Sequence, residues 1–172
     1  KQNEILELFR QTGALLHGHF VLRSGLHSRE FFQCALLLRD TKVAERVCGA
    51  LADQLRSAEF DTVISPALGG ILVGQEVARQ LGKPHIFSEK NDAGALVLRR
   101  GFTIKLGERF AVIEDVVTRG GRLMETVEIV QQHGGVVVAA ASLVNRSGGE
   151  LPAMNFPFHG LVELNPETFP PD

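Results

Sequence analysis

Two adjacent acids followed by a glycine turn are the residues best placed to do chemistry in this chain. Glu114 and Asp115 end an apolar, β-type run, and residues 118–122 then read Thr-Arg-Gly-Gly-Arg before a helical pattern begins. The N-terminus of a helix presents unpaired backbone N–H groups, and glycines let a phosphate approach them closely. Carboxylates at the carboxyl end of a strand lie where hydroxyls or a hydrated divalent cation would bind. Phosphate on one side and a diol or metal on the other predict a phosphorylated sugar as the ligand.

The side chains of this motif limit what it can do. Glu114 and Asp115 are strand neighbours, so their side chains should point to opposite sides, which argues against a paired general acid and base. Holding two ribose hydroxyls, or ordering the water shell of a metal, fits better than the ordinary role of hydrogen-bonding a neighbouring turn. Arg119 and Arg122 offer bidentate donors to a phosphate dianion. The loop is not the nucleoside-triphosphate P-loop, because it contains no Gly-Lys-Ser/Thr.

Helices and strands alternate along most of the chain. Helices are predicted at residues 3–12 (with Asn3 as N-cap and Gly13 after the end), 41–55 (with Asp40 as N-cap) and 71–81. Strands are predicted at 61–65, 85–88, 110–113, 136–144 and 158–164, with a small hairpin at 95–99 and 102–105 that turns near Arg100-Gly101. The order strand, glycine turn, helix occurs twice, with the glycine turns at residues 66–70 and 118–122. Two such units predict an α/β fold with a doubly wound, mainly parallel sheet, whose ligand crevice lies at the carboxyl ends of the strands.

Length and composition favour one folded, soluble domain. The 172 residues are expected to form a single domain, 1–172, with its α/β core at 61–164. A formal net charge of −2 gives no general reason to expect nucleic-acid binding. Cys34 and Cys48 lack the spacing of a metal site, which indicates buried free thiols in a reducing compartment. Without a signal peptide or an apolar run near the ~18 residues of a membrane span, a cytoplasmic location is expected.

Four segments resemble one enzyme family. Residues 112–121, Val-Ile-Glu-Asp-Val-Val-Thr-Arg-Gly-Gly, resemble the phosphoribosyl-pyrophosphate (PRPP) signature of the type I phosphoribosyltransferases. Residues 18–32, 65–71 and 143–149 are similar to segments of the orotate phosphoribosyltransferases within that family. The resemblance implies transfer of the 5-phosphoribosyl group from PRPP to orotate, which gives orotidine 5′-monophosphate and pyrophosphate in de novo pyrimidine synthesis. It also implies Mg²⁺ as cofactor, a homodimer, and a small N-terminal hood formed mainly by residues 14–39.

The resemblance assigns roles to individual residues. The ribose hydroxyls and the water shell of a PRPP-borne Mg²⁺ would meet Glu114 and Asp115, with no metal ligand supplied directly by the protein. The 5′-phosphate would lie in the loop that contains Val116, Val117, Thr118, Arg119, Gly120, Gly121 and Arg122. Pyrophosphate would meet Ala67, Leu68, Gly69 and Gly70, together with Lys90. Orotate would bind to Thr118, Arg146, Arg23, Phe31 and Phe32, with Arg146 pairing with its carboxylate. Lys90, Asp115 and Glu114 are the residues expected to act in catalysis.

The chain departs from the family pattern in two places. Many relatives have a long mobile loop with a second Lys and a His, whereas residues 87–102 keep only Lys90, as in a short-loop subgroup with a β-hairpin flap. Arg99 and Arg100 are candidate replacements, but a solvated turn explains them equally well. In the phosphate loop, Arg119 and Arg122 replace hydroxyl residues, which should keep phosphate affinity and change its geometry.

Other functions and ordinary structural roles stay open at this point. A phosphoribosyltransferase for a purine or uracil is disfavoured by Arg146, because neither base carries a carboxylate. A non-catalytic PRPP-sensing regulator is disfavoured by the lack of a basic helix or a helix-turn-helix pattern. Arg146 could be a surface arginine, and one of Phe31 and Phe32 is expected in the core. The histidines at positions 17, 19 and 27 are interpreted as hydrogen-bonding or surface residues rather than zinc ligands.

Overall fold

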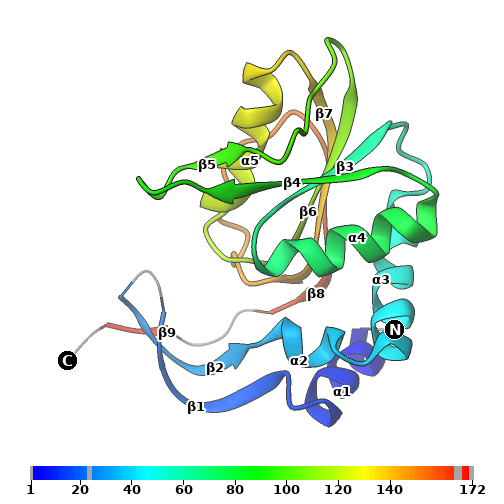
Figure 1. The fold of residues 1–172 in the computed structure, drawn as a ribbon. Helices are drawn as coiled ribbons and strands as arrows, with labels where there is room; N and C mark the ends of the chain where they lie inside the picture. The colour runs from blue at the N-terminus through cyan, green and yellow to red at the C-terminus, as the bar shows by residue number, and fades with distance from the viewer. Residues whose placement is uncertain (1, 23–24, 165–167, 171–172) are drawn as a thin grey trace.

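The structure is a computed structural model that describes residues 2–22, 25–164 and 168–170 (Figure 1). Its elements are α1 (Gln2–Gln11), β1 (Leu15–Val21), β2 (His27–Phe32), α2 (Cys34–Leu38), α3 (Thr41–Leu55), β3 (Thr62–Pro66), α4 (Gly69–Leu81), β4 (His85–Lys90), β5 (Leu96–Leu98), β6 (Arg109–Val117), α5 (Gly121–Gln132), β7 (Val136–Asn145), β8 (Phe158–Glu163) and β9 (Thr168–Phe169). Within these described residues, every helix is too short or too polar to cross a membrane.

The central sheet is doubly wound and mainly parallel, as predicted. Its strand order is β5-β4-β3-β6-β7-β8, and only the edge strand β5 runs antiparallel to its neighbour. The chain leaves β3 through α4 towards β4, and leaves β6 through α5 towards β7, in the opposite direction. Strand order therefore reverses between β3 and β6, and a ligand crevice is expected outside the carboxyl ends of these two strands.

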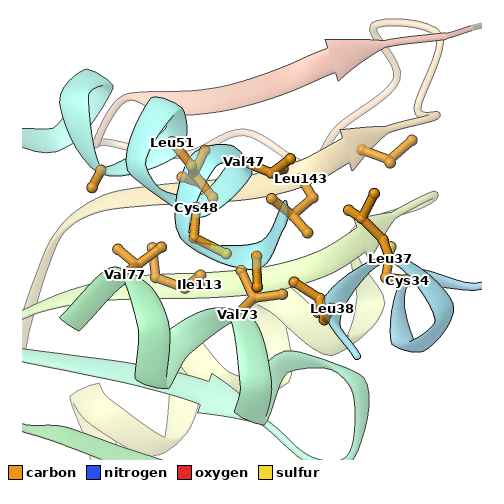
Figure 2. Close-up of a cluster of buried hydrophobic side chains, with 14 of the residues drawn as sticks. Cys34, Leu37, Leu38, Val47, Cys48, Leu51, Val73, Val77, Ile113 and Leu143 are labelled. Atoms are coloured by element: carbon orange, nitrogen blue, oxygen red, sulfur yellow. The ribbon is translucent and has the colours of Figure 1, made fainter. Parts of the chain in front are cut away.

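Helices cover both faces of this sheet. Figure 2 shows α3 and α4 packed on one face, where Leu51 and Val77 meet Ile113 of β6 in a cluster of buried side chains. On the other face, α5 buries Leu123 against Val112, which is the strand neighbour of Ile113. Because successive strand residues face opposite ways, the continuous apolar run of β6 contributes side chains to the hydrophobic core on each face of the sheet. Burial on both faces fixes the strand that carries the adjacent acids.

A second, smaller sheet forms the hood. Its strand order is β1-β2-β9, with antiparallel pairing, and in Figure 1 it lies below the central sheet beside α1 and α2. Its inner side is anchored by Phe9 of α1 and Phe32 of β2, whose rings meet edge to face with centroids 5.4 Å apart. Cys34 begins α2, and both it and Cys48 are buried free thiols, as predicted. Burial raises the pKa of both thiols, to about 12 for Cys48.

Some boundaries predicted from the sequence are wrong. The first helix begins at Gln2, so Asn3 lies inside it and is not its N-cap. The hairpin turns at residues 91–95 and pairs β5 with β4, so residues 102–105 form no strand. Helix α4 begins at Gly69, so the two glycines open the helix rather than form the turn before it. The short helix α2 and the strand β9 were not predicted.

The N-cap of α3 provides a stability prediction. The Asp40 carboxylate accepts hydrogen bonds from the backbone N–H groups of Lys42 and Val43, at 3.0 and 3.2 Å. Asp40→Ala would leave both donors without their cap and should cost about 1 kcal/mol, or about 3 °C in Tm. Asp40→Asn keeps the accepting oxygen and should stay closer to the parent. Thermal unfolding followed by circular dichroism measures both variants, and equal losses would show that the side-chain oxygen does not cap this helix.

Candidate functional site

The predicted phosphate turn lies at the carboxyl end of β6. Gly120 has a φ of 76° and is the N-cap of α5. A methyl group at Gly120 would lie 3.0 Å from the Cδ atom of Pro152, so both the backbone angle and the space require glycine. By contrast, a methyl group at Gly121 would meet open space. Thr118 and Arg119 are exposed beside this opening. The arrangement leaves the N-terminal N–H groups of α5 accessible to an anion.

The second βα turn meets the acids of the first. Residues Ala67 and Leu68 are joined by a cis peptide bond, and the Ala67 N–H donates to the Ser88 carbonyl at 2.7 Å. Helix α4 then begins at Gly69, where an added methyl group would collide with the Asp115 carboxylate. The start of α4 and the end of β6 are therefore in direct contact. This brings the two predicted ligand loops, which are far apart in the sequence, together at the reversal of strand order.

The two acids are withdrawn from solvent. Glu114 is 7% exposed, and Asp115 is partly buried, with its carboxylate accepting from the Val116 N–H at 2.8 Å. Burial raises the pKa of Asp115, and hydrogen bonds from backbone N–H groups and with the Glu114 side chain partly offset that rise. The two carboxyl groups interact, and the expectation that their side chains point to opposite sides stays a prediction. A pair of carboxyl groups held beside two helix N-termini is suited to binding neighbouring hydroxyls.

Arg146 joins the crevice to the hood. Its backbone N–H donates to the Val117 carbonyl at 2.8 Å, which places it directly beside the phosphate turn. Its Nη2 atom donates to Ser28 Oγ and to the Glu30 carbonyl of β2, at 3.2 and 3.4 Å. The guanidinium also lies over the Phe32 ring, 5.7 Å from its centroid. Burial lowers the pKa of Arg146. This side chain is not the surface arginine that a residue after a strand usually is.

One donor of Arg146 has no protein partner. Its Nε atom is buried and makes no hydrogen bond within the part of the chain that the structure describes. A buried N–H without an acceptor is costly, and another molecule such as a water or a ligand can supply one. Among the other residues predicted for the base, Phe32 is core, at 4% exposure, and Phe31 stacks on Phe20 with centroids 5.5 Å apart. The predicted contact at Arg23 lies outside the described residues.

The remaining cations differ in how firmly they are held. Lys90 is exposed at the end of β4, next to the pyrophosphate loop because β4 pairs with β3 in register. Arg100 donates to Glu89 at 2.5 Å and lies over the Phe87 ring, which favours a structural role for it over a catalytic one. Arg122 pairs with Glu125 at 3.2 Å. Arg119 has no such contact among the described residues and is exposed, so it is the more available of the two loop arginines.

Two hollows elsewhere on the surface contain fewer groups that could bind or react with a ligand. One, of about 560 Å³, lies on the hood beside His19 and His27, whose ring nitrogens are hydrogen-bonded at 2.8 Å. That contact agrees with the hydrogen-bonding role predicted for these histidines. The other, of about 520 Å³, lies at the amino ends of the central strands, where its Arg109 is already paired with Asp61. No group of three or more potential metal ligands occurs in residues 2–22, 25–164 and 168–170.

Comparison with known proteins agrees with this geometry. A family model described as phosphoribosyl transferase domain matches residues 37–161. The orotate phosphoribosyltransferase of Carboxydothermus hydrogenoformans is 47% identical, over 98% of this chain and 88% of its own. That of Caldicellulosiruptor saccharolyticus is 45% identical, over 97% and 86%. The crystal structure of orotate phosphoribosyltransferase from Aeropyrum pernix superimposes with a TM-score of 0.73 at 26% identity, covering 85% of this chain and 84% of that one.

Proposed function

Because the chain belongs to the phosphoribosyltransferase family, and to its orotate-specific branch, we propose that it transfers the 5-phosphoribosyl group of PRPP to orotate. The products are orotidine 5′-monophosphate and pyrophosphate, in pyrimidine nucleotide synthesis. The observation that carries orotate as the acceptor is Arg146. Its side chain is partly buried beside the phosphate turn, and its buried Nε atom has no acceptor within the described residues. A carboxylate on the base would satisfy that donor, and neither uracil nor a purine base carries one.

Each part of PRPP is assigned to a different part of the proposed site. The 5′-phosphate would bind the loop of residues 116–122, whose glycines give it access to the N-terminal N–H groups of α5. The ribose hydroxyls would donate to Glu114 and Asp115. Pyrophosphate would lie against residues 67–70 at the start of α4. The contact between Asp115 and Gly69 supports this layout, because the ribose lies between the two phosphate groups of PRPP.

The reaction breaks the bond from C1 of the ribose to the pyrophosphate oxygen, which leaves with the electron pair. A bond then forms from C1 to the deprotonated orotate nitrogen, whose proton is released to water. Positive charge develops on the ribose, and the carboxylates of Glu114 and Asp115 would stabilise it. Lys90 would neutralise charge on the leaving pyrophosphate. Arg146 would hold orotate in line with C1, so that catalysis is mainly positioning and electrostatics. No covalent nucleophile is required.

Magnesium fits this donor set as a substrate-borne ion. Mg²⁺ keeps several waters and is usually held by one or two carboxylates together with substrate phosphates. Glu114 and Asp115 are the carboxylates that would bind its water shell, and the ion would supply further charge neutralisation for pyrophosphate.

We also propose a homodimer. Leu68 and Leu72, which are 83% and 53% exposed at the start of α4, are apolar side chains that a second copy would cover. The buried free thiols support a reducing, cytoplasmic location.

A single assay tests the activity. Protein is mixed with Mg²⁺, PRPP and orotate, and the loss of orotate absorbance is followed. We expect turnover that stops when EDTA removes the metal, and no product when uracil or adenine replaces orotate. Turnover that survives EDTA would refute the magnesium role alone. PRPP binding without turnover would instead indicate a PRPP-sensing module and would overturn the enzymatic proposal.

A further inference from the structure

Ser28 forms several hydrogen bonds, and none of the roles assigned so far involves this residue. It is the second residue of β2 and is 1% exposed. Its hydroxyl donates to the Glu30 carbonyl at 2.9 Å and accepts from the Glu30 N–H at 3.2 Å. It also accepts from Nη2 of Arg146 at 3.2 Å, across a separation of 118 residues. A hood side chain is thus in direct contact with the residue proposed to bind the base.

The hydroxyl of Ser28 has only one orientation available. A serine hydroxyl has one proton and two lone pairs, and here the proton is given to the Glu30 carbonyl. The oxygen can therefore act towards Arg146 only as an acceptor. The Glu30 carbonyl accepts from the same Nη2 atom at 3.4 Å, and the Phe32 ring lies against the guanidinium. Two acceptors on one nitrogen and a ring on one face fix the plane of the guanidinium group.

This anchoring leaves the charge of Arg146 available. Glu30 contributes its backbone carbonyl, whereas its carboxylate lies 3.6 Å from Nδ1 of His17. Arg146 is thus held by neutral oxygens and makes no ion pair within the described residues. Its Nε atom, in the same plane, is left buried without an acceptor. A guanidinium that is fixed in orientation, keeps its charge and has an unused donor is prepared for an anionic ligand group.

We propose that Ser28 is a positioning residue that sets the direction in which Arg146 presents its free donor to the carboxylate of orotate. The inference rests on the proposed function and deepens it. In this proposal the hood does more than cover the base. It also helps the enzyme to select a carboxylated pyrimidine over an uncharged one. Without the Ser28 oxygen, Arg146 would keep its charge but sample several orientations. Ligand binding would then have to fix the Arg146 side chain, and the entropy lost in doing so would weaken the affinity.

The test compares Ser28→Ala with Thr62→Val. Thr62 is a matched control, because it is a buried hydroxyl (5% exposed) that holds a charged side chain, Glu108, at 2.6 Å. It lies at the opposite, amino end of the central strands. For Ser28→Ala we expect the orotate KM to rise about tenfold, the PRPP KM to stay within about twofold, and competitive inhibition by uracil to be unchanged. Thr62→Val should change none of the three.

Calorimetric titration with orotate separates failure of this inference from failure of the proposed function. If the parent turns over orotate but Ser28→Ala leaves its KM unchanged, or weakens uracil equally, the positioning role is wrong and the enzyme assignment stands. If the parent is inactive, orotate binding is measured directly, and a tenfold weaker Kd in Ser28→Ala still supports the anchoring of Arg146. Absence of orotate binding to the parent would overturn both.

Discussion

Arg146→Ala is expected to raise the KM for orotate about 100-fold while changing that for PRPP less than about threefold. Removing one partner of a buried, charge-assisted hydrogen-bonded pair typically costs about 2–5 kcal/mol, and 100-fold corresponds to about 2.7 kcal/mol. The orotate carboxylate would lose its only proposed cationic partner. PRPP would keep both helix N-termini and both acids. Steady-state kinetics with each substrate varied in turn measures the two constants.

Arg146→Lys and Arg109→Ala are the controls for this result. Lysine keeps the positive charge but lacks the planar fork, so Arg146→Lys should recover only part of the orotate affinity. Arg109 is ion-paired with Glu59 and Asp61 at the amino ends of the central strands, far from the proposed site. Arg109→Ala therefore tests for general loss of structure. Since Arg146 also bridges hood and core, Tm should be recorded for each variant. Equal increases in both KM values for Arg146→Ala would place this arginine outside the orotate site.

The phosphate turn could be predicted because its signals are local. The acids, the glycines and the helix that follows them occupy one short segment, and the φ of 76° at Gly120 is the kind of backbone angle that a glycine before a helix indicates. The reversal of strand order also followed from sequence, since two strand-turn-helix units that diverge from neighbouring strands leave few alternatives. The contact between Asp115 and Gly69 is a direct consequence of that topology.

The hairpin and the anchoring of Arg146 could not be predicted, for different physical reasons. Two turn signals compete near the flap, and the backbone angles at Arg100 and Gly101 are indeed those of a turn. The strand pairing is nevertheless set at Asn91, which bonds Ala95 through both its backbone and its side chain. For Ser28, no local pattern indicates a partner 118 residues away. The hydroxyl near the start of β2 meets its partner only when the hood folds onto the core.

Asp115→Asn is expected to lower kcat/KM for PRPP about 100-fold and, at the same time, to raise Tm at neutral pH. The loss of activity follows because the amide has no charge to offer the ribose hydroxyls or the positive charge that develops on the sugar. The gain in stability follows from the sign of the pKa shift. Burial raises the pKa of Asp115 above the ordinary value of 3.8, so ionisation of this group is more costly in the folded chain than in the unfolded one.

The pH dependence of this stabilisation gives an independent check. Below the unfolded pKa the parent Asp115 is protonated in both states and carries no penalty. As the pH rises through the higher folded pKa the penalty develops in full. The Tm advantage of Asp115→Asn should therefore be large at pH 7 and shrink as the pH is lowered towards 3.8. Circular dichroism melts across this range measure it, because asparagine does not titrate.

Asp61→Asn is the matched control, with the opposite sign. Asp61 lies beside the amino end of β6, where hydrogen bonds from Arg109 lower its pKa. Its charge therefore stabilises the fold at neutral pH, and Asp61→Asn should lower Tm there, lose that effect in acid, and leave kcat/KM unchanged. If Asp115→Asn destabilised the chain as Asp61→Asn does, the charge of Asp115 would be structural. A loss of activity together with a gain in stability would instead mean that the buried charge is kept for its ligand, at the expense of the fold.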